Sequence, residues 1–248
     1  SPGGYLTYVT VMATENTTNI IFDDFTAGIN IINHTAGVTP INVVLNEGET
    51  YLIAVGANDG GIPNDLIGTR ISSDKPIVVN SGSGTGSFAD GSLGRDFGID
   101  QIVGSDKVGN EYIFVRGNGG TTTGNQWENV LIVANQDNTD IFVNGSSSPE
   151  ATIDAGDWIV IEGDGINNNG NGYNANGNMY VQTSNPVFAY QGIGGQPNAT
   201  PNQGMFFVPP LSCENRGDVD NISGINFIGN TVFNGGVSIV TNKLATIS

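Results

Sequence analysis

The chain has very few of the residues that build disulfides, zinc sites or catalytic triads. Among its 248 residues there is one cysteine, Cys213, and one histidine, His34. A disulfide within one chain needs two cysteines, and protein zinc sites draw mainly on Cys and His side chains. We therefore expect no internal disulfide and no zinc site, and we interpret Cys213 as a small packed residue.

Positive charge is also scarce. Seven Lys and Arg residues stand against 24 Asp and Glu residues, which gives a formal net charge of -17 at pH 7. Affinity for nucleic acid or for an anionic membrane surface depends on clustered Lys and Arg, so the composition excludes nucleic acid as a partner. The sequence also has no apolar run of about 20 residues, and we predict no membrane insertion.

Glycine, asparagine, serine and threonine are abundant, with 37 glycines alone, and the apolar residues stand in short dense runs. These runs alternate in polarity and are rich in β-branched residues, and none keeps a helical period for more than two turns. The pattern predicts an all-β fold. The predicted strands are residues 5–13, 19–22, 29–33, 41–45, 50–55, 68–72, 76–80, 112–116, 129–134, 140–143, 151–153, 157–161, 179–182 and 187–191.

Several segments of the first half return in the second. Residues 48–55 (GETYLIAV) return as 156–162 (GDWIVIE), 75–79 (KPIVV) as 185–189 (NPVFA), and 13–22 as 134–143. Residues 237–242 then resemble 130–135 once more. Self-similarity at a fixed period is the signature of a repeat protein.

We predict tandem β-sandwich-like repeats of about 108 residues. The first repeat covers residues 1–105, the second 106–203, and residues 204–248 begin a third, incomplete repeat. About seven short strands in each repeat is the number found in β-sandwich domains. The alternative is a β-propeller, whose blades recur at about 40 to 50 residues, a period that we do not find inside either repeat.

Motifs along nearly the whole chain resemble the IgG-Fc-binding-protein N-terminal domain family. These motifs are residues 13–18 (ATENTT), 45–51 (LNEGETY), 65–77 (DLIGTRISSDKPI), 109–113 (GNEYI), 136–139 (QDNT) and 206–211 (FFVPPL). The family occurs in a mucus glycoprotein and in very large secreted surface proteins of gliding bacteria. The resemblance implies a secreted, extracellular or cell-surface protein with a role in adhesion.

Ligand contacts are expected in the loops. Residues 163–177 form an Asn- and Gly-rich stretch, where we expect nothing to bury Tyr173 and predict Tyr173 and Asn174 as contacts. Trp158, by contrast, is expected in the core, at the position equivalent to Tyr51. Arg216-Gly217-Asp218 spells the tripeptide that integrins bind, although an Asp-rich chain also produces such a triplet by chance.

Acidic residues between the first two repeats are candidates for a structural calcium ion. Asp90, Asp96, Asp100 and Asp106 lie there in Gly- and Ser-rich sequence. Ca²⁺ binds six to eight oxygen atoms from carboxylates, amides and backbone carbonyls. The alternative is that these carboxylates are simply solvated at the surface, since the stretch matches no established calcium-loop pattern.

We find no signature of an enzyme, neither a nucleophile elbow nor a phosphate-binding loop. The chain is therefore predicted to be a non-enzymatic adhesion module whose partner is a surface glycan, a protein ligand or further repeats of the same protein. A structural spacer of a filament is the first alternative. A carbohydrate-active enzyme is the second, and it would need two carboxylates about 5 to 10 Å apart.

Overall fold

The computed structural model describes residues 6–35, 39–56, 66–86, 96–117, 128–163, 171–192, 205–211, 227–228 and 230–232. Contacts between Cα atoms divide the chain into one part spanning Ser1–Pro210 and another spanning Leu211–Ser248. The prediction of an all-β fold is confirmed, because the described residues form strands and, as their one helical element, the short 3₁₀ turn Ser105–Lys107.

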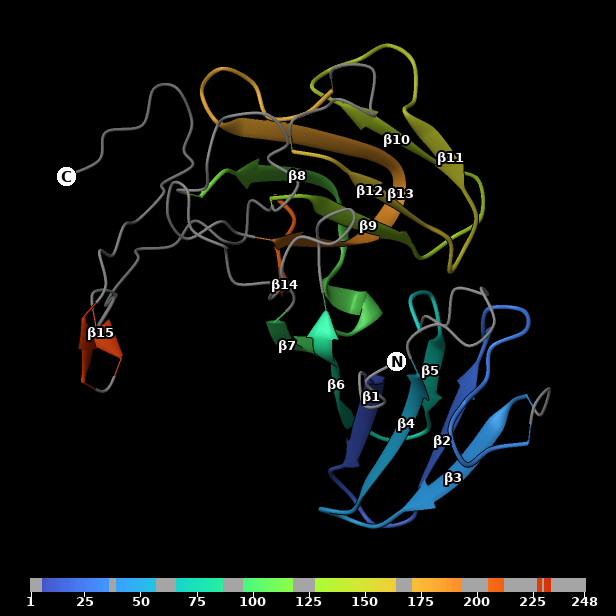
Figure 1. The fold of residues 1–248 in the computed structure, drawn as a ribbon. Coiled ribbons are helices and arrows are strands. Elements are labelled where there is room, and N and C mark those ends of the chain that lie inside the picture. The colour runs from blue at the N-terminus through green and yellow to red at the C-terminus, as the bar shows by residue number, and fades with distance from the viewer. Residues whose placement is uncertain are drawn as a thin grey trace. The chain divides into compact units, whose positions relative to one another are not determined.

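The first seven strands, which we call the first strand set, form two antiparallel sheets (Figure 1). The strands are β1 (Leu6–Ala13), β2 (Thr18–Asp23), β3 (Ile41–Leu45), β4 (Thr50–Gly56), β5 (Arg70–Ser73), β6 (Ile77–Gly86) and β7 (Asp96–Ile102). One sheet has the order β4-β1-β6-β7 and the other the order β3-β2-β5. Side chains along β2 alternate between buried and exposed, which is the pattern of a strand with one face on a core.

Both sheets of the first strand set contribute to a single core. Phe22 on β2 and Val55 on β4 are completely buried in it, and Val11 and Ile53 are nearly so. A core shared between two antiparallel sheets is the arrangement of a β-sandwich.

The second strand set forms one seven-stranded antiparallel sheet that is nearly closed, like a barrel. Its strands are β8 (Gly109–Val115), β9 (Val130–Ala134), β10 (Thr139–Val143), β11 (Ala151–Ile153), β12 (Trp158–Ile161), β13 (Asn178–Gly192) and β14 (Met205–Phe207). The long strand β13 joins the sheet together. Its first half pairs with β8 and β10, and its second half pairs with β9 and β14.

A second, separate core lies inside this sheet. Tyr112 and Phe114 on β8 are completely buried there, and their rings stack with centroids 6.2 Å apart. The hydroxyl of Tyr112 donates to the carbonyl of Val187 and accepts the N–H of Gly109. The core also includes Val208, so the second strand set extends beyond residue 203, where the sequence pattern placed the end of the second repeat.

Among the described residues of the part spanning Leu211–Ser248, β15 (Phe227–Ile228) pairs antiparallel with β16 (Thr231–Val232). Residues 237–242, which resemble 130–135, lie outside the described residues.

Corresponding strands pair in the same way in the two sets. In the first set β1 pairs with β4 and β6, and β2 pairs with β3 and β5. In the second set β9 pairs with β12 and the second half of β13, and β10 pairs with β11 and the first half of β13. Continuous β13 thus takes the place of both β5 and β6.

Two turns of the first strand set hold each other through reciprocal hydrogen bonds, an arrangement that we call the turn clasp. The turns are residues 15–18 and 46–49. The side-chain oxygen of Asn16 accepts the Glu47 N–H at 3.2 Å, and that of Asn46 accepts the Thr17 N–H at 3.2 Å. Such Asx side chains stabilise turns by satisfying backbone donors that strands leave unpaired.

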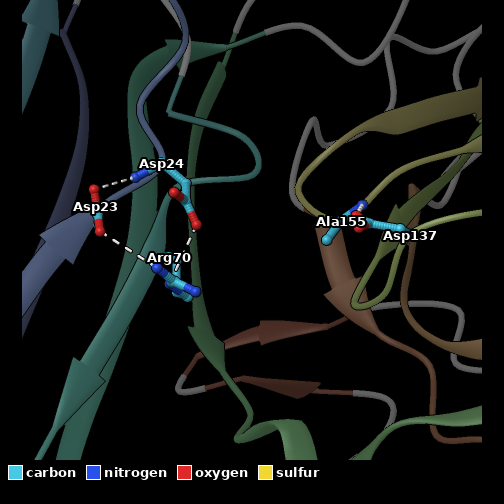
Figure 2. Close-up of polar contacts among 5 residues, drawn as sticks. All are labelled: Asp23, Asp24, Arg70, Asp137 and Ala155. Carbon is cyan, nitrogen blue, oxygen red and sulfur yellow. Dashed lines mark hydrogen bonds and ion pairs between the residues drawn. The ribbon is translucent and has the colours of Figure 1, made fainter.

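The second strand set has a turn clasp of the same design, formed by residues 136–139 and 154–157. Here the carboxylate of Asp137 accepts the Ala155 N–H at 3.1 Å (Figure 2), and that of Asp154 accepts the Asn138 N–H at 2.9 Å. Thr17 and Asn138 also share a positive φ, 55° and 54°. The two turn clasps therefore match bond for bond, although only some of their residues are identical.

Each turn clasp also contains a completely buried threonine. Thr18 donates its hydroxyl to the carbonyl of Glu15 at 2.7 Å, and Thr139 donates to that of Gln136 at 2.7 Å. Because each threonine is completely buried, water cannot replace its hydroxyl as the donor to the turn carbonyl. Removal of either hydroxyl leaves a carbonyl without this donor, which costs about 1–3 kcal/mol.

Thr18→Val and Thr139→Val are accordingly expected to lower the free energy of unfolding by similar amounts, about 1–2 kcal/mol each. The two changes should add within about 0.5 kcal/mol in the double variant, because they lie in separate cores. Urea denaturation measures both quantities. Thr152→Val, at an exposed threonine of β11, is the control and should change stability by less than about 0.5 kcal/mol. A large cost for one turn clasp and none for the other would contradict the match between them.

Several strand predictions differ from the structure, and β14, β15 and β16 were not among the predicted strands. Residues 29–33 are not a strand but contribute a single bridge, Ile31 to Val55. Strand β7 was not predicted, because its Gly- and Asp-rich sequence has low β-propensity and gains its place by pairing with β6. The runs 179–182 and 187–191 form one continuous strand. The shared two-sheet core and the nearly closed sheet favour sandwich and barrel geometry over the propeller alternative.

Candidate functional site

Four strands of the second set have one of their ends on the same side of that set's sheet. We call this region the loop end. Val115 at the end of β8, Val130 at the start of β9, Ile161 at the end of β12 and Gln191 on β13 meet there. Residues 118–127 lie between β8 and β9, residues 164–170 between β12 and β13, and residues 193–204 between β13 and β14, and all three ranges are outside the described residues.

Three polar side chains are buried at the loop end. Glu128 is completely buried, and Asn129 and Gln191 are 4% and 3% exposed. Asn129 accepts the backbone N–H of Gly163 at 3.1 Å, and Gln191 donates to the carbonyl of Val115 at 2.8 Å. Burial of polar groups costs free energy unless they are paired, and these hydrogen bonds tie the start of β9 to the end of β12 and β13 to the end of β8.

Tyr173 completes this group. Its ring packs against the second core, and its hydroxyl accepts the side-chain N–H of Gln191 at 2.7 Å. Burial raises the pKa of Tyr173 far above its usual value, the negative charge of Glu128 raises it further, and Arg116 opposes the shift. The phenol therefore stays protonated. The expectation that nothing buries Tyr173 is wrong, since residues 128 and 191 supply the surroundings that a local sequence pattern does not show.

Asn174 closes a turn next to Tyr173. Its side-chain oxygen accepts the N–H groups of Asn176 and Asn178, and its backbone N–H donates to the carbonyl of Asn178. This turn leads the chain into β13. Asn174 is exposed, and its role as a ligand contact stays a prediction.

The first strand set has no comparable polar group among its described residues. Thr18, which belongs to the turn clasp, is its one buried polar side chain there. The position that corresponds to Gln191 is Ser81, and beside it the ring of Tyr8 covers Gly82, where an added Cβ atom would lie 2.7 Å from the Tyr8 hydroxyl. The two sets therefore share the clasped turns and differ at the opposite end.

Comparison with known families identifies the chain. The family model described as IgGFc binding protein matches residues 1–246. The chain belongs to this family. The resemblance found in the sequence motifs is thereby confirmed, and the IgGFc binding protein family is a family of binding domains rather than a known enzyme family. No curated protein and no solved structure matches the chain.

Membership of the IgGFc binding protein family agrees with an extracellular binding module. No helix long and apolar enough to span a membrane is present among the described residues.

In the part of the chain that the structure describes, no three His, Cys, Asp or Glu side chains come together, and the two calcium candidates with described side chains make other contacts. Asp100 accepts the backbone N–H groups of Gln101 and Phe207, and burial raises its pKa despite these bonds. Asp106 instead forms an exposed ion pair with Lys107 at 2.9 Å, and its pKa is lowered by this partner.

The remaining calcium candidates are Asp90, which lies outside the described residues, and Asp96, of which only the backbone in β7 is described. Calcium binding therefore stays a prediction. Residues Arg216, Gly217 and Asp218 also lie outside the described residues, and integrin recognition stays a prediction as well.

Trp158 is not in the core. It is 41% exposed and pairs with Val133, the counterpart of Met12, which pairs with Thr50 in the first set. Trp158 thus corresponds to Thr50 and not to Tyr51, and a shift of one residue moves a side chain to the opposite face of a sheet.

No motif in the sequence singles out Glu128, Asn129 or Gln191. A detectable signal was the pair Glu128-Asn129 directly before the apolar run of β9, because a charged residue at a strand start needs partners once the strand is buried. Those partners come from residues far away in the sequence, so the site itself could not be assembled in advance.

Proposed function

We propose that this chain is a non-enzymatic adhesion module of a large secreted cell-surface protein. Tandem β-sandwich-like repeats at residues 1–105 and 106–203, with a third beginning at 204–248, form its scaffold. The loop end of the second strand set binds a surface protein or glycan. Family membership supports a binding role, and multiple weak copies can give strong attachment through multivalency.

This proposal rests on one observation: the two strand sets agree at their turn clasps and differ at the opposite end. The turn clasps agree in their hydrogen bonds, in buried Thr18 and Thr139, and in positive φ at Thr17 and Asn138. At the loop end, by contrast, the second set has buried Glu128 where the first has partly buried Thr7. A protein that acts only as a spacer gives no reason for the loop ends of the two strand sets to differ. Binding surfaces, by contrast, are commonly built from variable loops on a constant scaffold.

The buried polar group gives the loop end a rigid base. Tyr173, Gln191 and Asn129 fix the strand ends from which residues 118–127, 164–170 and 193–204 continue. A ligand that binds to such a pre-formed base loses less affinity to the ordering of side chains and loops.

Replacement of residues 164–170 by a Gly-Ser sequence of equal length tests the proposal. Wild-type chain is first screened against the Fc fragment of IgG, because the family description names it, and against a glycan array. We expect the replacement to weaken binding to whatever the wild type captures by at least about tenfold, measured by surface plasmon resonance.

Thr139→Val serves as the matched control, because it acts at the opposite end of the same strand set. It should lower stability and leave affinity within about twofold, whereas the loop replacement should do the reverse. Equal affinity of the loop variant and the wild type would contradict binding at the loop end. Absence of any ligand for the wild type would favour the spacer alternative.

A further inference from the structure

Strand β5 has one edge that no strand of the described residues occupies. It lies at the end of the sheet β3-β2-β5, and its pairing partner is β2 on the other side. Unpaired N–H and C=O groups at such an edge can bind another extended chain.

The corresponding edge in the second strand set is occupied. There the first half of β13 pairs with β10 on one side, as β5 does with β2, and with β8 on the other. Val181 of β13 is completely buried beside β8, whereas its counterpart Ile71 of β5 is only partly buried. Thr183 is 4% exposed, whereas its counterpart Ser73 is exposed. The first set thus shows the exposure expected when a strand like β8 is missing.

The hydrogen-bond pattern tells which groups of β5 face the free edge. Asp74 donates its N–H to the carbonyl of Asn19, so these two residues form a hydrogen-bonded pair. Alternation along an antiparallel ladder then points Ser72 toward β2 and leaves the backbone groups of Ile71 and Ser73 facing outward. In the second set the equivalent groups of β13 face β8.

The charged side chain of β5 does not cover the free edge. Arg70, the one charged residue of β5, points back to β2, where it forms ion pairs with Asp23 and Asp24 at 3.3 and 3.2 Å (Figure 2). It therefore does not shield the edge, as charged side chains of edge strands often do.

We propose that the free edge of β5 binds an extended polypeptide segment with the pattern of β8. The segment lies antiparallel to β5, exchanges hydrogen bonds with Ile71 and Ser73, and inserts alternate apolar side chains into the first core. In β8 these side chains are Tyr112 and Phe114. Strand addition of this kind takes affinity from main-chain hydrogen bonds and specificity from alternate side chains. The inference goes beyond the proposed adhesion function and does not depend on the loop end.

A fluorescent peptide of residues 108–116 (VGNEYIFVR) tests the proposal with the full chain. We expect saturable binding in fluorescence anisotropy with a Kd on the order of 100 µM. Ser73→Pro removes an outward N–H and should weaken binding at least about tenfold, whereas Ser73→Ala keeps that N–H and should bind as the wild type does.

Modified peptides test the same geometry without any change to the protein. Arg116 donates to the carbonyl of Gly177, which places Tyr112 and Phe114 in the hydrogen-bonded pairs of β8 with β13. N-methylation at Tyr112 of the peptide, which pairs with Val181 in β13 and would therefore face Ile71 of β5, should abolish binding, and N-methylation at Ile113, whose N–H faces away, should not.

Three results would overturn the proposal. One is the absence of saturable binding at about ten times the expected Kd. Another is binding that is unaffected by Ser73→Pro, which would mean that the peptide displaces β8 of the second set. The third is self-association of the chain that Ser73→Pro abolishes, because a second copy would then be the occupant of the edge.

Discussion

Tyr112→Ala is expected to lower the free energy of unfolding by about 3–5 kcal/mol, the cost of removing a large buried aromatic side chain. Tyr112 is completely buried on β8, and its ring stacks on Phe114. Its hydroxyl bonds both to Gly109 at the start of its own strand and to Val187 on β13. The residue therefore connects β8 to both halves of the long strand, and its loss leaves a cavity and unpaired backbone groups.

Two companion variants separate these contributions. Tyr112→Phe keeps the ring and removes the hydroxyl, and it should cost about 1–2 kcal/mol. Tyr180→Ala changes a tyrosine of β13 that is only partly buried and should cost less than Tyr112→Ala. Urea denaturation followed by tryptophan fluorescence and circular dichroism gives the three values. If Tyr112→Ala costs no more than Tyr180→Ala, Tyr112 does not hold the second core.

The strands that were predicted correctly have a local cause. Alternation and β-branched residues in 41–45 and 151–153 predicted strands that the structure has with the same bounds. The turns could also be predicted, because Asn, Asp and Gly mark positions such as Gly48 and Gly156, whose φ values are 77° and 86°. Strand alternation and turn residues depend on a few neighbouring residues, so a short stretch of sequence is enough to predict them.

The errors arise where a residue's surroundings come from far away. Trp158 was assigned to the core by an alignment one residue out of register, and only the cross-strand partner Val133 corrects it. Tyr173 lies in a stretch of Asn and Gly but is covered through Gln191 and the second core. Strand β7 is fixed by its partner β6 rather than by its own residues. Register and long-range burial decide all three cases.

The two strand sets show how a binding protein can keep a scaffold and change a site. Bonds within the turn clasps are made mostly to the backbone, so Asn16 and Asp137 can exchange an amide for a carboxylate without loss of the arrangement. The loop end depends on side chains that contact each other, and the first set has Thr7 and Ser81 at the positions of Glu128 and Gln191. The residues of the loop end can therefore differ between the two sets while the core of each set stays intact.

Stability is expected to fall steeply as pH rises from about 10 to 12, because three buried tyrosines resist ionisation. Burial raises the pKa of Tyr112 to about 12 and raises those of Tyr173 and Tyr190 as well. A tyrosine in the unfolded chain ionises near pH 10. Above that pH the unfolded state releases protons that the folded state still holds, so the stabilisation is complete below about pH 10 and is lost as pH rises through the folded pKa.

Urea midpoints measured between pH 9 and pH 12 test this expectation, with Tyr112→Phe as the variant that removes one of the three groups. Its midpoint should decline less steeply with pH than that of the wild type, even though its stability at pH 7 is lower. Ionising tyrosines also add to a chain that already carries a net charge of -17. Salt at about 1 M screens this general repulsion but leaves the cost of ionising a buried phenol. An identical pH slope for both proteins at high salt would show that Tyr112 ionises as easily in the folded chain as in the unfolded one.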